Sequence, residues 1–223
     1  MPERYVCEVQ QNQPVVIEAG DVRLEGDLSV PPEATGIVLF AHGSGSSRFS
    51  PRNRSVASDL QQAGLATLLI DLLTADEEVL DEKTRELRFD IDLLADRLVH
   101  ATRWLSTTSD TATLPVGHFG ASTGAGAALV AAAKTPDRVK AVVSRGGRPD
   151  LAGELLAKVK APTMLIVGSN DAQVITLNRH AFEQLRSDKE LKLVEGASHL
   201  FEEPGTLDQV AQMAAEWFGR HLR

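Results

Sequence analysis

The sequence predicts an α/β protein built on a doubly wound, mostly parallel sheet of about eight strands, with an N-terminal antiparallel hairpin and helices on both faces. Short apolar segments alternate with amphipathic segments along almost the whole chain, as in successive βαβ units. Residues 36–42 (GIVLFAH) form an uninterrupted apolar run, which is typical of a central strand covered on both faces. Hydrophobic residues make up 43% of the chain, enough for the core of one domain spanning residues 1–223.

The expected strands are short apolar or alternating runs bounded by turn residues. Residues 14–19 and 22–30 predict a hairpin closed by Gly20 and Asp21. The remaining strands are expected at residues 36–42, 65–73, 113–119, 139–144, 162–168 and 189–195.

The expected helices begin at recognisable caps or show a helical apolar period. Ser50 and Pro51 predict the N-cap and first residue of a helix that ends near Gly64. The charged residues 74–88 predict a surface loop or a short helix, and whether they border the functional site stays open. A capping box is expected at Thr206–Gln209, opening the last helix. The other helices are expected around residues 91–105, 124–134, 151–159 and 176–185.

Composition excludes several classes of protein. The net charge of −8 and the 4% content of aromatic residues argue against a nucleic-acid surface and against attraction to anionic membranes. No signal pattern or transmembrane-length apolar run is recognised, so a cytoplasmic protein is expected. A lone cysteine, Cys7, rules out an intrachain disulfide and a cysteine-based zinc site. No metal or cofactor is expected, and Cys7 as a nucleophile is a poorly placed alternative.

One motif carries chemistry. Gly120-Ala-Ser122-Thr-Gly124 has the form G-x-S-x-G and lies between a predicted strand and a predicted helix. A sharp strand-to-helix turn exposes the serine hydroxyl, and glycines two residues to either side allow neighbouring backbone to pass closely. The plain alternative is a glycine-rich turn before a helix of small residues. As a nucleophile, Ser122 needs a histidine base and an acid to orient that base.

Reactive groups in doubly wound sheets lie beyond the carboxyl ends of the strands. Of six histidines, only His42 and His199 directly follow predicted strands, and only His199 fits the order Ser…Asp…His. Asp171, directly after strand 162–168, is the candidate acid, and Asp150 is the reserve candidate. The other histidines are expected in helices, within a strand or near the C-terminus: His100, His118, His180 and His221.

A tetrahedral intermediate requires backbone N–H donors. Thr123, at the start of the helix after the serine, should supply one. The loop after strand 36–42 (HGSGSSRFSPRN) should supply the other, from Ser44 or from Gly45. A Gly/Ser-rich loop before a helix can also cradle phosphate, but the lysine and spacing of a P-loop are missing.

These residues, in this order, resemble the α/β-hydrolase superfamily. The small size and the lack of an inserted cap domain resemble its dienelactone hydrolase-like branch, over nearly the whole chain. Similar domains, with AHGSGSSR-like and RGGRPDL-like stretches, also occur fused to phosphoribosyltransferase domains. Dienelactone hydrolases proper have a cysteine nucleophile and a glutamate-bearing stretch where this chain has Ser122 and His42-Gly43. The resemblance therefore implies the fold and the triad, but not dienelactone as substrate.

The resemblance implies hydrolysis of a small-molecule ester or lactone through an acyl-enzyme on Ser122. A hydrolase-fold binding protein with an idle triad stays open, as does an acyltransferase or thioesterase using the same triad. A peptidase is less favoured, because no propeller or lid-like domain is recognised.

Three arginines follow predicted strands on the expected active-site side: Arg48, Arg145 and Arg148. One or more of them could bind a carboxylate or phosphate of an anionic substrate. Structural salt bridges are the alternative. The substrate, the oligomeric state and the pathway do not follow from the sequence.

Overall fold

The computed structural model describes residues 12–223, so Cys7 lies outside the described residues. The strands lie close to their expected positions. They are β1 (Gln13–Ala19), β2 (Val22–Ser29), β3 (Ile37–Ala41), β4 (Ala66–Ile70), β5 (Val116–Ala121), β6 (Val139–Arg145), β7 (Thr163–Gly168) and β8 (Lys189–Val194).

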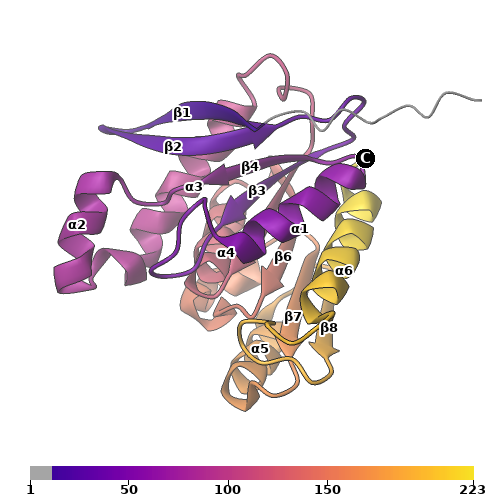
Figure 1. Ribbon diagram of the computed structural model, residues 1–223. Helices are drawn as coiled ribbons and strands as arrows, with labels where there is room; N and C mark the ends of the chain where they lie inside the picture. The colour runs from indigo at the N-terminus through magenta and orange to yellow at the C-terminus, as the bar shows by residue number, and fades with distance from the viewer. Residues whose placement is uncertain (1–11) are drawn as a thin grey trace, which may run out of the picture.

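All eight strands form one sheet in the order β1-β2-β4-β3-β5-β6-β7-β8 (Figure 1). β1 pairs antiparallel with β2, and β2 pairs antiparallel with β4. Every other neighbouring pair is parallel. The predicted fold class is confirmed, and the carboxyl ends of β3, β5, β6, β7 and β8 meet at one edge of the sheet.

Helices cover both faces of the sheet. The cluster of buried side chains on one face includes those of α1 and α6, which lie side by side in Figure 1, and the cluster on the other face includes those of α3, α4 and α5. The α-helices are α1 (Pro51–Gln62), α2 (Ala75–Thr84), α3 (Ile91–Leu105), α4 (Thr123–Lys134), α5 (Ala172–Gln184) and α6 (Thr206–His221). Two 3-10 segments are η1 (Leu87–Phe89) and η2 (Pro149–Lys158). In the described residues no helix has the length and apolarity that a membrane crossing requires.

Two helix starts differ from expectation. The predicted capping box at Thr206 is wrong, because Gly205, with φ 75°, caps α6 and the Thr206 hydroxyl donates to the Glu203 carbonyl. The capping box forms instead at Thr74 and Glu77, where each side chain accepts the other's backbone N–H. Residues 74–88 therefore begin with a short helix, α2.

Three other boundaries shift for local reasons. α5 begins at Ala172 rather than at residue 176, because Asp171 accepts from the Val174 amide as its N-cap. The predicted helix at 151–159 is the 3-10 segment η2, broken at Gly153 with φ 51°. β5 begins at Val116, since Pro115 has no N–H to donate to a neighbouring strand.

Candidate active site

Ser122 lies on a strained turn between β5 and α4. Its φ of 50° and ψ of −123° are unusual for a residue with a side chain. A Cβ atom on Gly120 would lie 2.4 Å from the Ala125 Cα, and one on Gly124 would lie 2.4 Å from the Ala41 carbonyl oxygen. Both glycines are therefore required for the backbone to pass so closely, which is the packing predicted for this motif.

Asp171 and His199 come together from the ends of neighbouring strands. Asp171 follows β7 and His199 follows β8, and the His199 Nδ1–H donates to Asp171 Oδ2 at 2.6 Å. The other carboxylate oxygen accepts from the Val174 amide at 3.4 Å, so the start of α5 fixes the acid. The loops themselves are joined by the Asn170 amide, which donates to the Ala197 carbonyl.

The reserve acid, Asp150, is held elsewhere. Arg148 donates to both of its carboxylate oxygens, at 2.9 Å and 2.7 Å. This pair leaves Asp171 as the carboxylate that contacts a histidine at the carboxyl edge of the sheet.

Ser122 and His199 line one cavity of about 260 Å³, together with Arg52, Asn53 and Arg145. We call this space the arginine cavity. Among the described residues no direct hydrogen bond joins Ser122 to His199. Such contacts are often long in the unliganded enzyme and tighten when substrate binds.

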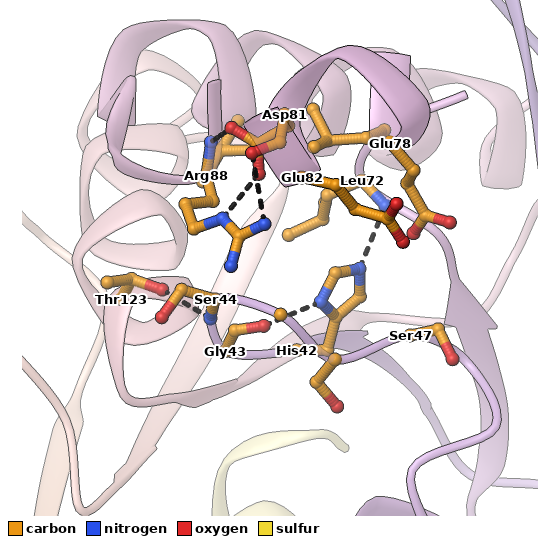
Figure 2. A pocket seen from close by; sticks show the side chains of 14 residues that line it. His42, Gly43, Ser44, Ser47, Leu72, Glu78, Asp81, Glu82, Arg88 and Thr123 are labelled. Atoms are coloured by element: carbon orange, nitrogen blue, oxygen red, sulfur yellow. Dashed lines mark hydrogen bonds and ion pairs between the residues drawn. The ribbon is translucent and has the colours of Figure 1, made fainter. Parts of the chain in front are cut away.

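The loop after β3 is held by His42. Its Nδ1–H donates to the Gly43 carbonyl at 2.9 Å, and its Nε2 accepts from the Leu72 amide at 3.0 Å (Figure 2). Burial lowers the pKa of His42, which favours the neutral ring that these two bonds require. His42 is therefore a structural anchor for the loop, which we call the oxyanion loop (residues 42–47).

The Ser44 amide, expected to face the oxyanion, is already engaged. It donates to the Thr123 Oγ1 at 2.9 Å, as Figure 2 shows. The Thr123 hydroxyl therefore accepts the Ser44 N–H in this structure, and Ser44 as an oxyanion donor stays a prediction. The Thr123 amide, at the first turn of α4, has no hydrogen-bond acceptor in the part of the chain that the structure describes. It is free to receive an anionic oxygen.

A second cavity, of about 390 Å³, also opens along the oxyanion loop. Figure 2 shows Glu78, Asp81 and Glu82 projecting from α2 around it, so we call it the acidic cavity. Asp81 accepts from the Arg88 guanidinium and amide, whereas Glu78 and Glu82 have no ion-pair partner among the described residues. Residues 74–88 therefore do border the candidate site, which the sequence left open.

The three predicted arginines have different environments. The Arg48 guanidinium donates to Asp71 and Glu25, and that of Arg148 donates to Asp150. Both arrangements match the salt-bridge alternative. Arg145 alone lines a cavity with Ser122. Sequence reasoning missed Arg52 and Asn53, whose only signal was their place in the first turn of a helix that follows the oxyanion loop.

The comparisons with known proteins agree with this fold. The sequence model of the dienelactone hydrolase family matches residues 24–222. The chain belongs to the dienelactone hydrolase family. A crystal structure of a dienelactone hydrolase from Anabaena variabilis is 63% identical, with a TM-score of 0.95, over 97% of this chain and 100% of that one. Est1E from Butyrivibrio proteoclasticus shares the fold with a TM-score of 0.78, at 15% identity, over 93% of this chain and 98% of its own.

A curated relative adds a difference in length. A Mycobacterium tuberculosis protein named "Putative phosphoribosyl transferase" is 58% identical over 212 residues, which are 95% of this chain and 47% of that protein. This chain thus spans about half the length of the curated relatives it matches. The esterase domain of a Rhodothermus marinus protein, at 19% identity and a TM-score of 0.76, also shares the fold.

Proposed function

We propose that the protein is a serine hydrolase that cleaves a small carboxylic ester or lactone through an acyl-enzyme. The observation that carries the proposal is the placement of Ser122. It lies on a strained elbow and opens into the cavity lined by His199, whose Nδ1–H is held by Asp171 at 2.6 Å. Nucleophile, base and orienting acid are thereby supplied by the carboxyl ends of three parallel strands.

Each residue then has one task. Asp171 holds the proton on Nδ1 of His199, leaving Nε2 to take the proton of the Ser122 hydroxyl as the oxygen attacks the ester carbonyl. The amide of Thr123 stabilises the oxyanion, and the Ser44 amide joins it when the charged oxygen displaces the Thr123 hydroxyl as acceptor. His199 then protonates the leaving alkoxide and activates the water that releases the acid.

Two other functions use the same residues. An acyltransferase or thioesterase differs only in the acceptor or the leaving group, so product analysis with added alcohols and thioesters separates them. A binding protein with an idle triad would leave Ser122 unreactive. We further propose that the transferase name of the M. tuberculosis relative refers to the half of that protein which this chain does not match.

The test is covalent labelling with a fluorophosphonate, followed by intact mass and peptide mapping. The proposal predicts one adduct on Ser122, absent in Ser122→Ala and slowed in His199→Gln. Ser58→Ala, at an exposed position of α1 away from both cavities, is the matched control and should label normally. Absence of labelling in folded protein would support the idle-triad alternative. Labelling of Cys7 instead would revive the cysteine nucleophile.

A further inference from the structure

Arg145 is a buried cation without a counter-ion. It is the last residue of β6, pairs in register with Ala121 beside the nucleophile, and is only 5% exposed. One guanidinium nitrogen donates to the Asn53 side-chain carbonyl at 3.0 Å, and Nε has no partner. In the described part of the chain no carboxylate forms an ion pair with it. Burying an unpaired charge is costly, so such a site favours a ligand of opposite charge.

A second cation faces the same cavity. Arg52, in the first turn of α1, donates to the exposed Glu202 with one nitrogen at 3.2 Å, while its buried Nε has no partner in the described part of the chain. Burial, and then the positive charge of Arg52, lower the pKa of Arg145 to about 10. The two guanidinium groups therefore repel each other, and an anion between them would relieve that repulsion.

The other charged residues around the site indicate which of the two cavities would bind an anion. Arg48 and Arg148, on the same side of the sheet, are both matched with carboxylates. The acidic cavity carries the opposite charge, and burial together with Asp71 and Glu82 raises the pKa of Glu78. An anionic group is therefore favoured in the arginine cavity and disfavoured in the acidic cavity.

We propose that Arg145 and Arg52 form an anion subsite beside Ser122, which selects esters or lactones carrying one carboxylate or phosphate group at the end that enters the arginine cavity. The guanidinium nitrogens would bind the anion, with Asn53 holding Arg145 in place. This inference rests on the proposed function for its catalytic meaning, but the anion subsite can be tested without catalysis.

The kinetic test compares matched substrates. 4-Nitrophenyl hemisuccinate carries a carboxylate on the acyl side, and its kcat/KM is divided by that of the neutral 4-nitrophenyl butyrate. 3-Acetoxybenzoate carries a carboxylate on the alcohol side, and 3-acetoxyphenyl phosphate carries a phosphate there. The kcat/KM of each is divided by that of the neutral phenyl acetate. We expect one ratio to exceed 1 in wild type and to fall about 30-fold or more in Arg145→Gln, where the ratio cancels any loss of activity common to both esters.

The variants separate a local effect from a folding defect. Arg145→Lys should recover part of the ratio, and Arg52→Gln, at a position 34% exposed, should lower it by a smaller factor. Arg148→Gln, a matched arginine with its own carboxylate, should leave the ratio unchanged. Anionic and neutral esters hydrolysed alike by wild type, or an equal fall for both in Arg52→Gln, would overturn the inference.

A binding experiment keeps the inference independent of the triad. In Ser122→Ala, titration with succinate and with inorganic phosphate, followed by NMR, should shift signals of the arginine cavity, and Arg52→Gln should weaken that binding. Labelling of Ser122 without anion binding would reject the subsite and keep the hydrolase. Anion binding without labelling would reject the hydrolase and keep the subsite. Binding that is undiminished in both Arg52→Gln and Arg145→Gln would place the anion elsewhere and reject the subsite.

Discussion

The arginine cavity and the acidic cavity share the oxyanion loop but hold their charges in different ways. In the arginine cavity the cations project from the end of β6 and from α1, and Arg145 is buried without a counter-ion among residues 12–223. In the acidic cavity the carboxylates project from α2, a short helix between β4 and α3, and Glu78 and Glu82 are exposed. The comparison suggests that the sheet fixes the charge nearest the nucleophile, whereas a peripheral helix sets the charge of the far side.

The largest effect should come from removing the proposed catalytic base that lines the arginine cavity. His199→Gln leaves the cavity's cations in place but removes the base that activates Ser122. We expect kcat to fall by about a thousand-fold or more. Steady-state kinetics on a neutral ester measure this, with circular dichroism to verify folding. Near-normal turnover in the variant would show that the reactive group belongs to another part of the molecule.

A histidine of the core gives the next effect, on stability rather than activity. His118 lies fully buried between α3 and α4, its Nε2 bonded to Thr102 Oγ1 at 2.9 Å, and burial lowers its pKa to about 4. The folded protein therefore resists a proton that the unfolded chain binds near pH 6.5. Stability is complete above that pH and is lost as the pH falls toward about 4, by about 3 kcal/mol from this residue.

Urea unfolding at pH 7 and at pH 4.5 tests this expectation. His118→Gln should be less stable at pH 7 and should show a flatter loss of stability on acidification. The same slope in both proteins would assign the acid sensitivity to other groups. The measurement also shows whether a loss of activity in acid comes from unfolding or from titration of groups in the active site, which a comparison of the two cavities requires.

An intermediate effect is expected where the cavities meet. Thr123→Val keeps the shape of the side chain but frees the Ser44 amide and removes the tie between the oxyanion loop and α4. We expect kcat to fall by about ten-fold with a smaller change in KM, because a loosened loop aims its donor poorly at the transition state. Thr123→Ser should retain most activity. A rise in kcat for the valine variant would mean that the hydroxyl blocks the oxyanion site.

The smallest effect should come from the acidic cavity. Glu78→Gln combined with Glu82→Gln removes two exposed carboxylates, so esters with an anion at each end should gain about three-fold in kcat/KM. The gain should shrink at high salt, since exposed charges are screened. Kinetics at low and high ionic strength measure both. An equal gain on neutral esters would mean that the helix limits access by shape and not by charge.

The features that the sequence predicted well depend on local patterns. The strained turn at Ser122 follows from the two glycines around it, and the positions of Asp171 and His199 follow from the rule that parallel strands end at one edge. The buried anchor His42 was also expected directly after its strand. These features need no knowledge of which distant side chains meet.

The features that the sequence did not predict depend on contacts between side chains that are far apart along the chain. The sequence does not show that Arg48 pairs with Asp71 while Arg145 pairs with no carboxylate of residues 12–223, because such partners are far apart along the chain. The sequence also does not show that the Ser44 amide donates to the Thr123 hydroxyl, which lies 79 residues further along the chain. The capping box failed at Thr206 because Gly205 adopts a left-handed conformation, for which a residue without a side chain is suited.

The most direct measurement is the capture of the acyl-enzyme by rapid acid quench during turnover of 4-nitrophenyl hemisuccinate, with intact mass and peptide mapping. The account predicts a succinyl group on Ser122, absent in Ser122→Ala. If the acyl-side ratio is the one that exceeds 1, the group forms more slowly in Arg145→Lys and Arg52→Gln. Turnover without any covalent adduct, or an adduct on a residue outside the arginine cavity, would contradict it.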